Sequence, residues 1–154
     1  MKTIVSVMLG ATLLAAAPAW SQVTVDQPWV RGTVAAQKVT GAFMTLTAAK
    51  NSRLVAVSSP VAGAVEVHEM KMVDDVMRMR QVPALELPAS QPVALTPGGY
   101  HLMLFQLKQQ LKDGDKVPLT LEIENAAKVR STITVDAVVK PLNAAAASDH
   151  AGHH

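Results

Sequence analysis

Histidine and methionine are unevenly distributed along this chain of 154 residues. Two of its five histidines, His68 and His101, lie in the body of the sequence, and the other three lie at its end. Five of the eight methionines fall between residues 70 and 103: Met70, Met72, Met77, Met79 and Met103. Methionine is a common core filler, but a core stocked at random would spread it along the chain. The clustering indicates a site built from imidazole nitrogen and thioether sulfur.

A β-hairpin that turns at Asp74–Asp75 is predicted to carry part of this cluster. If the turn has two residues, Met70 lies opposite Met79 on the neighbouring strand. Glu69 and Arg80 then face each other on the opposite side of the hairpin, where their charges are complementary.

Four residues are predicted to converge on one ion: His68, Met79, His101 and Met103. In the hairpin register, His68 lies diagonal to Met79 on one face, at roughly 7–8 Å between Cα atoms. His101 and Met103 are two apart on another predicted strand, so they also share a face. Each residue taken singly is more often structural, and it is their convergence that favours a metal site.

The donor types select the metal. Thioether sulfur is soft and prefers Cu(I), and imidazole suits copper in either oxidation state. Calcium and magnesium require carboxylate oxygens, and zinc seldom takes thioether ligands. The chain has no cysteine, which excludes thiol nucleophiles and blue-copper ligation. Met70, Met72 and Met77 are interpreted as packing around the site or as a soft guard at its mouth, and Met44 as core.

The remaining pattern predicts an all-β domain. Short strands are separated by Gly, Pro and Asp turns, as in a β-sandwich or barrel with Greek-key connections. No window has helical periodicity over the length of a usual helix. Spacing alone does not distinguish an immunoglobulin-like sandwich from a cupredoxin-like one. The expected strands span residues 22–26, 39–48, 54–58, 65–73, 76–82, 85–87, 92–95, 101–107, 117–124 and 129–139.

Three segments are expected along the chain. Residues 1–21 read as a cleaved secretory signal peptide, with Lys2, an apolar run and small residues spaced for cleavage. Residues 22–140 form the β-domain, and 141–154 a flexible tail. An uncleaved membrane anchor is the weaker alternative, since the apolar run is short for a span, and without cysteine a lipid anchor is not expected. Formal net charge is only +2 and no basic cluster occurs, so nucleic-acid binding is disfavoured.

The spacing of the four candidate ligands resembles that of a known family, the PCuAC-type periplasmic copper chaperones. Their motif is H-x10-M-x21-H-x-M, and His68, Met79, His101 and Met103 match it without departure. The segment Trp29–Arg31 also looks like the family, and the resemblance covers roughly residues 23–138.

This resemblance implies a cupredoxin-like fold, a periplasmic location and a Cu(I) site near the surface with those four residues as ligands. We also expect a monomeric, non-enzymatic protein without stable membrane insertion. The implied role is delivery of copper for the copper A centre of cytochrome c oxidase subunit II, directly or through a Sco-type copper protein.

Some relatives in this family carry histidine-rich extensions, and the tail here resembles one. His150, His153 and His154 offer nitrogen donors without sulfur, which suit Cu(II). A flexible end or residual tag sequence is the alternative.

Three other functions stay open from the sequence. The same site would serve copper sequestration for tolerance, with no delivery partner. An adhesion or interaction module with incidental methionines would bind no copper. An electron-transfer cupredoxin is disfavoured by the missing cysteine, and no acid–base pair suggests an enzyme.

Overall fold

The computed structural model describes residues 22–143, and this range folds into ten β-strands without a helix. The strands are β1 (Val23–Arg31), β2 (Thr40–Ala48), β3 (Ser52–Ser58), β4 (Ala62–Val73), β5 (Val76–Gln81), β6 (Leu85–Leu87), β7 (Val93–Leu95), β8 (Tyr100–Leu107), β9 (Lys116–Asn125) and β10 (Arg130–Lys140). The all-β prediction is therefore confirmed. Within the described range there is also no helix suited to crossing a membrane.

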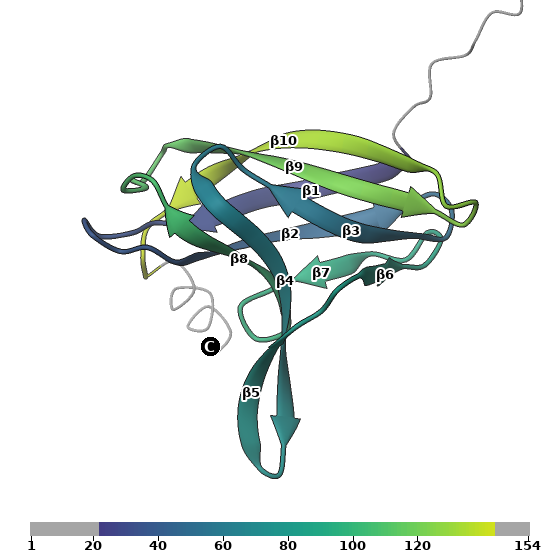
Figure 1. Cartoon of the computed structure of the whole chain (residues 1–154), viewed down its shortest axis with the longest axis horizontal. Coiled ribbons are helices and arrows are strands. Elements are labelled where there is room, and N and C mark those ends of the chain that lie inside the picture. The colour runs from purple at the N-terminus through teal and green to yellow at the C-terminus, as the bar shows by residue number, and fades with distance from the viewer. Residues whose placement is uncertain (1–21, 144–154) are drawn as a thin grey trace, which may run out of the picture.

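The strands form one sheet that closes on itself. Its order is β5-β4-β8-β2-β1-β10-β9-β3-β6, and a further pairing of β3 with β4 joins the two sides into a barrel (Figure 1). Most neighbours are antiparallel, but β1 and β10 run parallel. Strand β7 pairs with β2 beside this path.

Alternating apolar residues explain why the barrel closes around a core. On β9, Leu119, Leu121 and Ile123 point inward and are almost fully buried, as expected for strands with one face on a core. Leu102 and Leu104 of β8 join the same core from another side of the barrel. The residues that alternate with them on β8, His101 and Met103, therefore lie on the outer face of the barrel.

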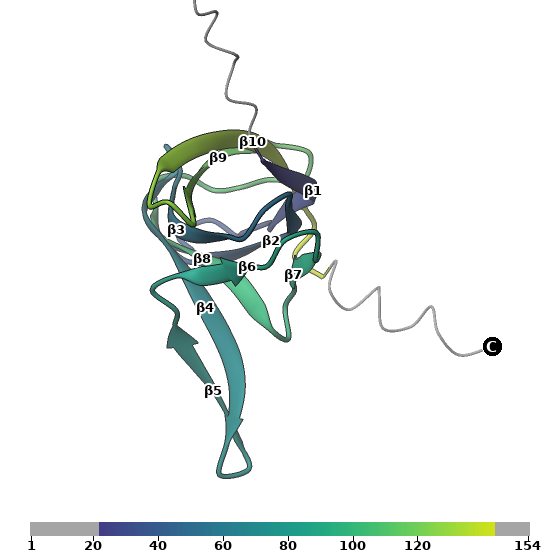
Figure 2. The same cartoon turned by 90° about the vertical axis from the view of Figure 1, so that its right-hand side faces the viewer.

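Strands β4 and β5 form an arm that projects from the barrel (Figures 1 and 2). The first part of β4 pairs with β8, and its second part pairs with β5. The turn residues Asp74 and Asp75 have φ of 52° and 61°, the left-handed values that a tight two-residue hairpin turn requires. The predicted register is confirmed, with Met70 opposite Met79.

The opposite face of the arm carries the predicted ion pair. Glu69 lies opposite Arg80 in the register, and their side chains are 3.0 Å apart. Such exposed pairs stabilise a protein only slightly, so this contact fixes register more than it adds stability.

Strand β1 is longer than the sequence predicted. Expected to end at Asp26, it continues to Arg31 after an irregularity between Asp26 and Trp29. Gln27 there has a φ of 49°, typical of a β-bulge. In the sequence, Gln27–Pro28 suggests the end of a strand. In the structure these two residues lie in the bulge, and pairing with β2 resumes at Trp29.

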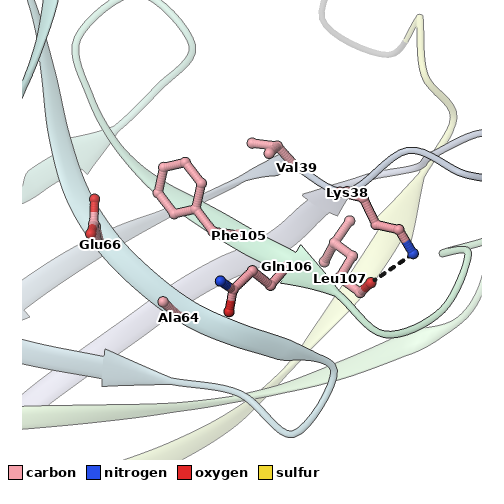
Figure 3. Close-up of a pocket in the computed structure, with 7 residues that line it drawn as sticks. All are labelled: Lys38, Val39, Ala64, Glu66, Phe105, Gln106 and Leu107. Atoms are coloured by element: carbon pink, nitrogen blue, oxygen red, sulfur yellow. Dashed lines mark hydrogen bonds between the residues drawn. The ribbon is translucent and has the colours of Figure 1, made fainter.

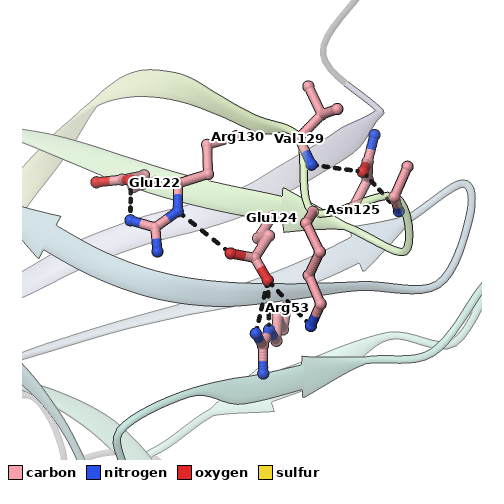
Figure 4. A network of polar contacts seen from close by, with 8 residues as sticks. Arg53, Glu122, Glu124, Asn125, Val129 and Arg130 are labelled. Carbon is pink, nitrogen blue, oxygen red and sulfur yellow. Dashed lines mark hydrogen bonds and ion pairs between the residues drawn. The ribbon is translucent and has the colours of Figure 1, made fainter.

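A buried carboxylate links three strands of the barrel (Figure 4). Glu124 of β9 accepts hydrogen bonds from Arg53 of β3, at 2.6 Å, and from Arg130 of β10, at 3.2 Å. Its carboxylate also lies 3.6 Å from the ammonium of Lys128. The hydrogen bond from Arg53 is the main reason why the pKa of Glu124 is lowered, and burial opposes this shift.

Candidate metal centre

Three neighbouring strands bring the four candidate ligands onto one outer face. In the register of β4 and β8, His68 lies directly opposite His101. In the register of β4 and β5, His68 lies opposite Gln81, which places Met79 diagonal to it as predicted. Met103 lies opposite Glu66 and shares the face of His101, because side chains two positions apart lie on the same side of a strand.

His101 and Met79 come into contact. The Nε2 atom of His101 lies 3.3 Å from the Sδ atom of Met79, and its Nδ1 atom lies 2.9 Å from the carbonyl oxygen of Gly99. A carbonyl only accepts hydrogen bonds, so Nδ1 carries the proton and donates it. The lone pair of the neutral ring is therefore on Nε2, next to the thioether sulfur.

The second histidine has an unpartnered nitrogen. His68 Nε2 lies 2.8 Å from the Oε2 atom of Glu66, and a carboxylate at this distance accepts the proton of the ring. The Nδ1 atom of His68 is buried and has no hydrogen-bond partner. Buried nitrogens without a partner are rare because they cost free energy. A metal ion in the cluster would remove this cost, so the side chains present fit such an ion.

The site has a buried half and an exposed half. His68 and His101 are only 8% and 5% exposed, whereas Met79 on the arm is 47% exposed. The two imidazole rings are 6.2 Å apart between centroids. Because metal–imidazole bonds are about 2 Å long, this separation leaves room for one ion between the rings. Such an ion would be held by the buried histidines of the barrel on one side and by the exposed arm on the other.

Aromatic side chains on β2 and β1 border the site. Gly41 lies opposite Met103, and a Cβ atom at Gly41 would come within 2.8 Å of the Phe43 ring. The absence of a side chain at Gly41 thus lets this ring lie over the strand. Trp29 packs against Phe43 at 4.5 Å between centroids, and Arg31 lies over the same ring at 5.4 Å.

Glu66 and Phe105 help to line an open hollow of about 710 Å³ (Figure 3). Two of its lining residues contact His68: Glu66 by the hydrogen bond already described, and Phe105 with its ring 5.8 Å away. The candidate ligands themselves do not line the hollow. It is therefore a neighbour of the site, and Glu66 lies between the two.

Sequence reasoning missed Glu66 and Gly99. Glu66 lies two residues before His68 on the same strand face, a spacing that could have suggested their contact. Gly99 lies two residues before His101, and its carbonyl sets the tautomer of that histidine. The candidate ligands of the tail, His150, His153 and His154, lie outside the described residues. Among residues 22–143, no three side chains of His, Cys, Asp and Glu gather at a common point.

Residues 23–136 match the family described as LpqE-like, putative lipoprotein LpqE-like. This chain belongs to that family. A putative lipoprotein of Leifsonia xyli subsp. xyli is 29% identical over 155 residues, which cover 93% of this chain and 90% of that protein.

Solved structures of PCuAC domains are similar to this LpqE-like chain. Apo-DR1885 from Deinococcus radiodurans is 31% identical, with a TM-score of 0.59 over 92% of this chain and 93% of that one. The CuI form of DR1885 is 33% identical, with a TM-score of 0.58 over 77% and 78% of the two chains. A copper-bound PCuAC domain from PmoF2, 24% identical, has a TM-score of 0.63 over 78% and 93% and shows the shared fold. The resemblance to PCuAC domains and the cupredoxin-like fold are confirmed.

Proposed function

We propose that this protein is a periplasmic copper chaperone that binds one Cu(I) ion through His68, Met79, His101 and Met103. The observation that carries the proposal is the contact of His101 Nε2 with Met79 Sδ, at 3.3 Å, on the strand position opposite His68, whose buried Nδ1 atom has no hydrogen-bond partner. Two imidazoles and two thioethers are neutral donors of the kind that Cu(I) prefers. Similar PCuAC domains whose structures are described as copper-bound or CuI forms support this choice of metal.

The same arrangement suits release by ligand exchange. His68 and His101 are fixed on the barrel by Glu66 and the Gly99 carbonyl. Met79 comes from the exposed arm, so an incoming ligand reaches the ion from this side and replaces the thioether first. A partner that offers thiolates would gain the ion because thiolate is the stronger soft donor.

Delivery for the copper A centre of cytochrome c oxidase subunit II, directly or through a Sco-type protein, is the role we infer from the family resemblance. Relatives named as putative lipoproteins support export, consistent with residues 1–21 acting as a signal peptide. Sequestration of copper for tolerance uses the same site. Oxidase activity in a strain that lacks the gene separates the two, because only a delivery protein is needed for oxidase assembly.

For the tail, we propose capture of Cu(II) by His150, His153 and His154, followed by reduction by an external reductant and transfer to the Cu(I) site. Deletion of residues 143–154 is expected to lower the Cu(II) stoichiometry. An unchanged Cu(II) stoichiometry after this deletion would overturn the role of the tail.

An anaerobic titration of Cu(I) against a colorimetric competitor tests the main site. We expect one tight equivalent for the wild-type protein and its loss in the double variant Met79→Ala/Met103→Ala. No tight Cu(I) in the wild-type protein would overturn the proposed function.

A further inference from the structure

Four methionines line one face of the arm. Met70 lies opposite Met79, and Met72 lies opposite Met77 in the register of β4 and β5. Since side chains alternate along a strand, all four share the face of His68. They form two cross-strand pairs that lead from the candidate metal centre toward the turn at Asp74–Asp75. We call Met70, Met72, Met77 and Met79 the methionine face.

Core packing does not explain these methionines. All six residues of β5 are exposed, and among the described strands β5 pairs only with β4. Met72 is 58% exposed and Met77 is 49% exposed, whereas Met44 in the barrel core is 3% exposed. Exposed apolar side chains at neighbouring positions are unfavourable in water and commonly mark a binding site.

The two faces of the arm differ in chemistry. The face opposite the methionines carries Lys71 and Arg78, which lie opposite each other, together with the Glu69–Arg80 pair. The charged side chains of the arm therefore lie on one face, and the four methionines lie on the other.

The spacing on the methionine face suits a soft ion. Residues directly opposite each other on paired strands have Cβ atoms about 4.5–5.5 Å apart. A methionine side chain has three rotatable bonds, so the sulfur atoms of neighbouring methionines can turn toward one point. Thioether sulfur selects Cu(I) over harder ions.

We propose that Met70, Met72 and Met77 hold a second Cu(I) ion on the arm. This inference rests on the proposed function, because it takes Cu(I) as the ion that the protein carries. With three thioethers and no imidazole, the arm site is the weaker of the two. Met79 lies between them: it is opposite Met70, and its sulfur contacts His101. An ion on the arm can therefore pass to the histidines by exchanging one thioether for the next.

Nuclear magnetic resonance of the methionine ε-methyl groups, recorded as Cu(I) is added anaerobically, distinguishes copper binding at the two sites by which signals shift. The first equivalent is expected to shift the signals of Met79 and Met103. The second equivalent is expected to shift those of Met70, Met72 and Met77 and, because Met79 lies opposite Met70, to shift the signal of Met79 once more. The tail from residue 144 onward contains no methionine, so copper bound there leaves these signals unchanged. A second equivalent that leaves Met70, Met72 and Met77 unshifted would overturn the arm site.

Two variants sharpen the test. In Met70→Leu/Met72→Leu/Met77→Leu, we expect the tight equivalent to remain and the shift of Met79 on adding the second equivalent to be lost. The control, Val73→Leu/Val76→Leu, changes exposed apolar residues near the tip and is expected to keep both ions. Suppose that wild type binds the first equivalent, and that the second equivalent shifts Met79 in the triple variant as it does in wild type. The arm site is then wrong, and the proposed function stands. If wild type binds no first equivalent at His101 and Met79, the proposed function itself fails.

Discussion

Met79 and His101 meet at 3.3 Å between sulfur and Nε2, although their strands do not pair with each other. Strand β4 lies between β5 and β8, so the two side chains reach across it on the outer face of the sheet. The arm is therefore joined to the barrel at the candidate metal centre by this contact as well as by the backbone of β4.

Replacing Met79 with leucine removes the sulfur and nearly preserves the side-chain volume. We expect Cu(I) affinity to fall by roughly tenfold or more, or about 1.4 kcal/mol of binding free energy. The free energy of unfolding should change by less than about 0.5 kcal/mol, because Met79 is exposed. A competition titration and a chemical denaturation measure the two quantities.

Met44→Leu is the matched control, since Met44 is buried in the core at 3% exposure. Its copper affinity should equal that of wild type, while the free energy of unfolding shifts by up to about 1.5 kcal/mol. Wild-type affinity in Met79→Leu would exclude Met79 as a ligand.

Glu66 is predicted to position His68 by holding its Nε2 proton. Partners of this kind change metal affinity by about 10–100-fold when they are removed, and we expect this loss for Glu66→Ala. Glu66→Gln keeps an acceptor oxygen and should lose less. Imidazole ¹⁵N resonances report the tautomer, which should become mixed in Glu66→Ala and stay fixed in Glu66→Gln.

The control for Glu66 is Glu69→Gln, on the opposite face of β4 and paired with Arg80. It should leave both the copper affinity and the histidine tautomer unchanged. If Glu66→Ala also leaves them unchanged, the contact at 2.8 Å does not position the ring.

Acid should weaken copper binding, because protons compete with the ion for the imidazole nitrogens. We expect Cu(I) affinity to fall as the pH is lowered from about 8 to about 5, the range in which histidines usually titrate. Competition titrations at several pH values measure this slope. A flat profile over that range would argue against His68 and His101 as ligands.

Glu124 should make the stability of the barrel depend on pH. Its pKa is lowered in the folded protein, mainly by the hydrogen bond from Arg53. The unfolded chain therefore binds the proton more readily, and the stabilisation is present above the ordinary glutamate pKa and lost as the pH falls through the lowered one. Denaturation of wild type and Glu124→Gln between about pH 7 and pH 3 tests this. The variant should be less stable at neutral pH, and the difference should shrink in acid. A difference that stays constant would assign the loss to packing.

The arm was predictable from the sequence because its contacts are local. A two-residue turn at Asp74–Asp75 fixes the pairing of β4 with β5, and every pair follows from it. The pairing of His68 with His101 was not predictable in the same way. The two residues are joined by a long connection through three other strands, so no turn specifies their register, and packing of the barrel decides it.

Other features were missed because they depend on atoms that a residue pattern does not specify. The sequence placed Met79 diagonal to His68, as the register has it, but it did not specify that the sulfur of Met79 contacts His101. Which imidazole nitrogen is free depends on Glu66 and on the Gly99 carbonyl. The extension of β1 to Arg31 depends on a bulge that accommodates Pro28.

The exposure of the arm also determines how this protein responds to oxidants. Peroxide converts methionine to its sulfoxide and reaches exposed side chains first. Met72, Met77 and Met79 are each about half exposed, while Met44 is buried. Oxidation would therefore remove the proposed thioether ligands and leave the barrel core intact, so that a folded protein would lose the copper that we propose it carries. Methionine sulfoxide reductases reverse this modification, and repair on the arm would restore binding without refolding.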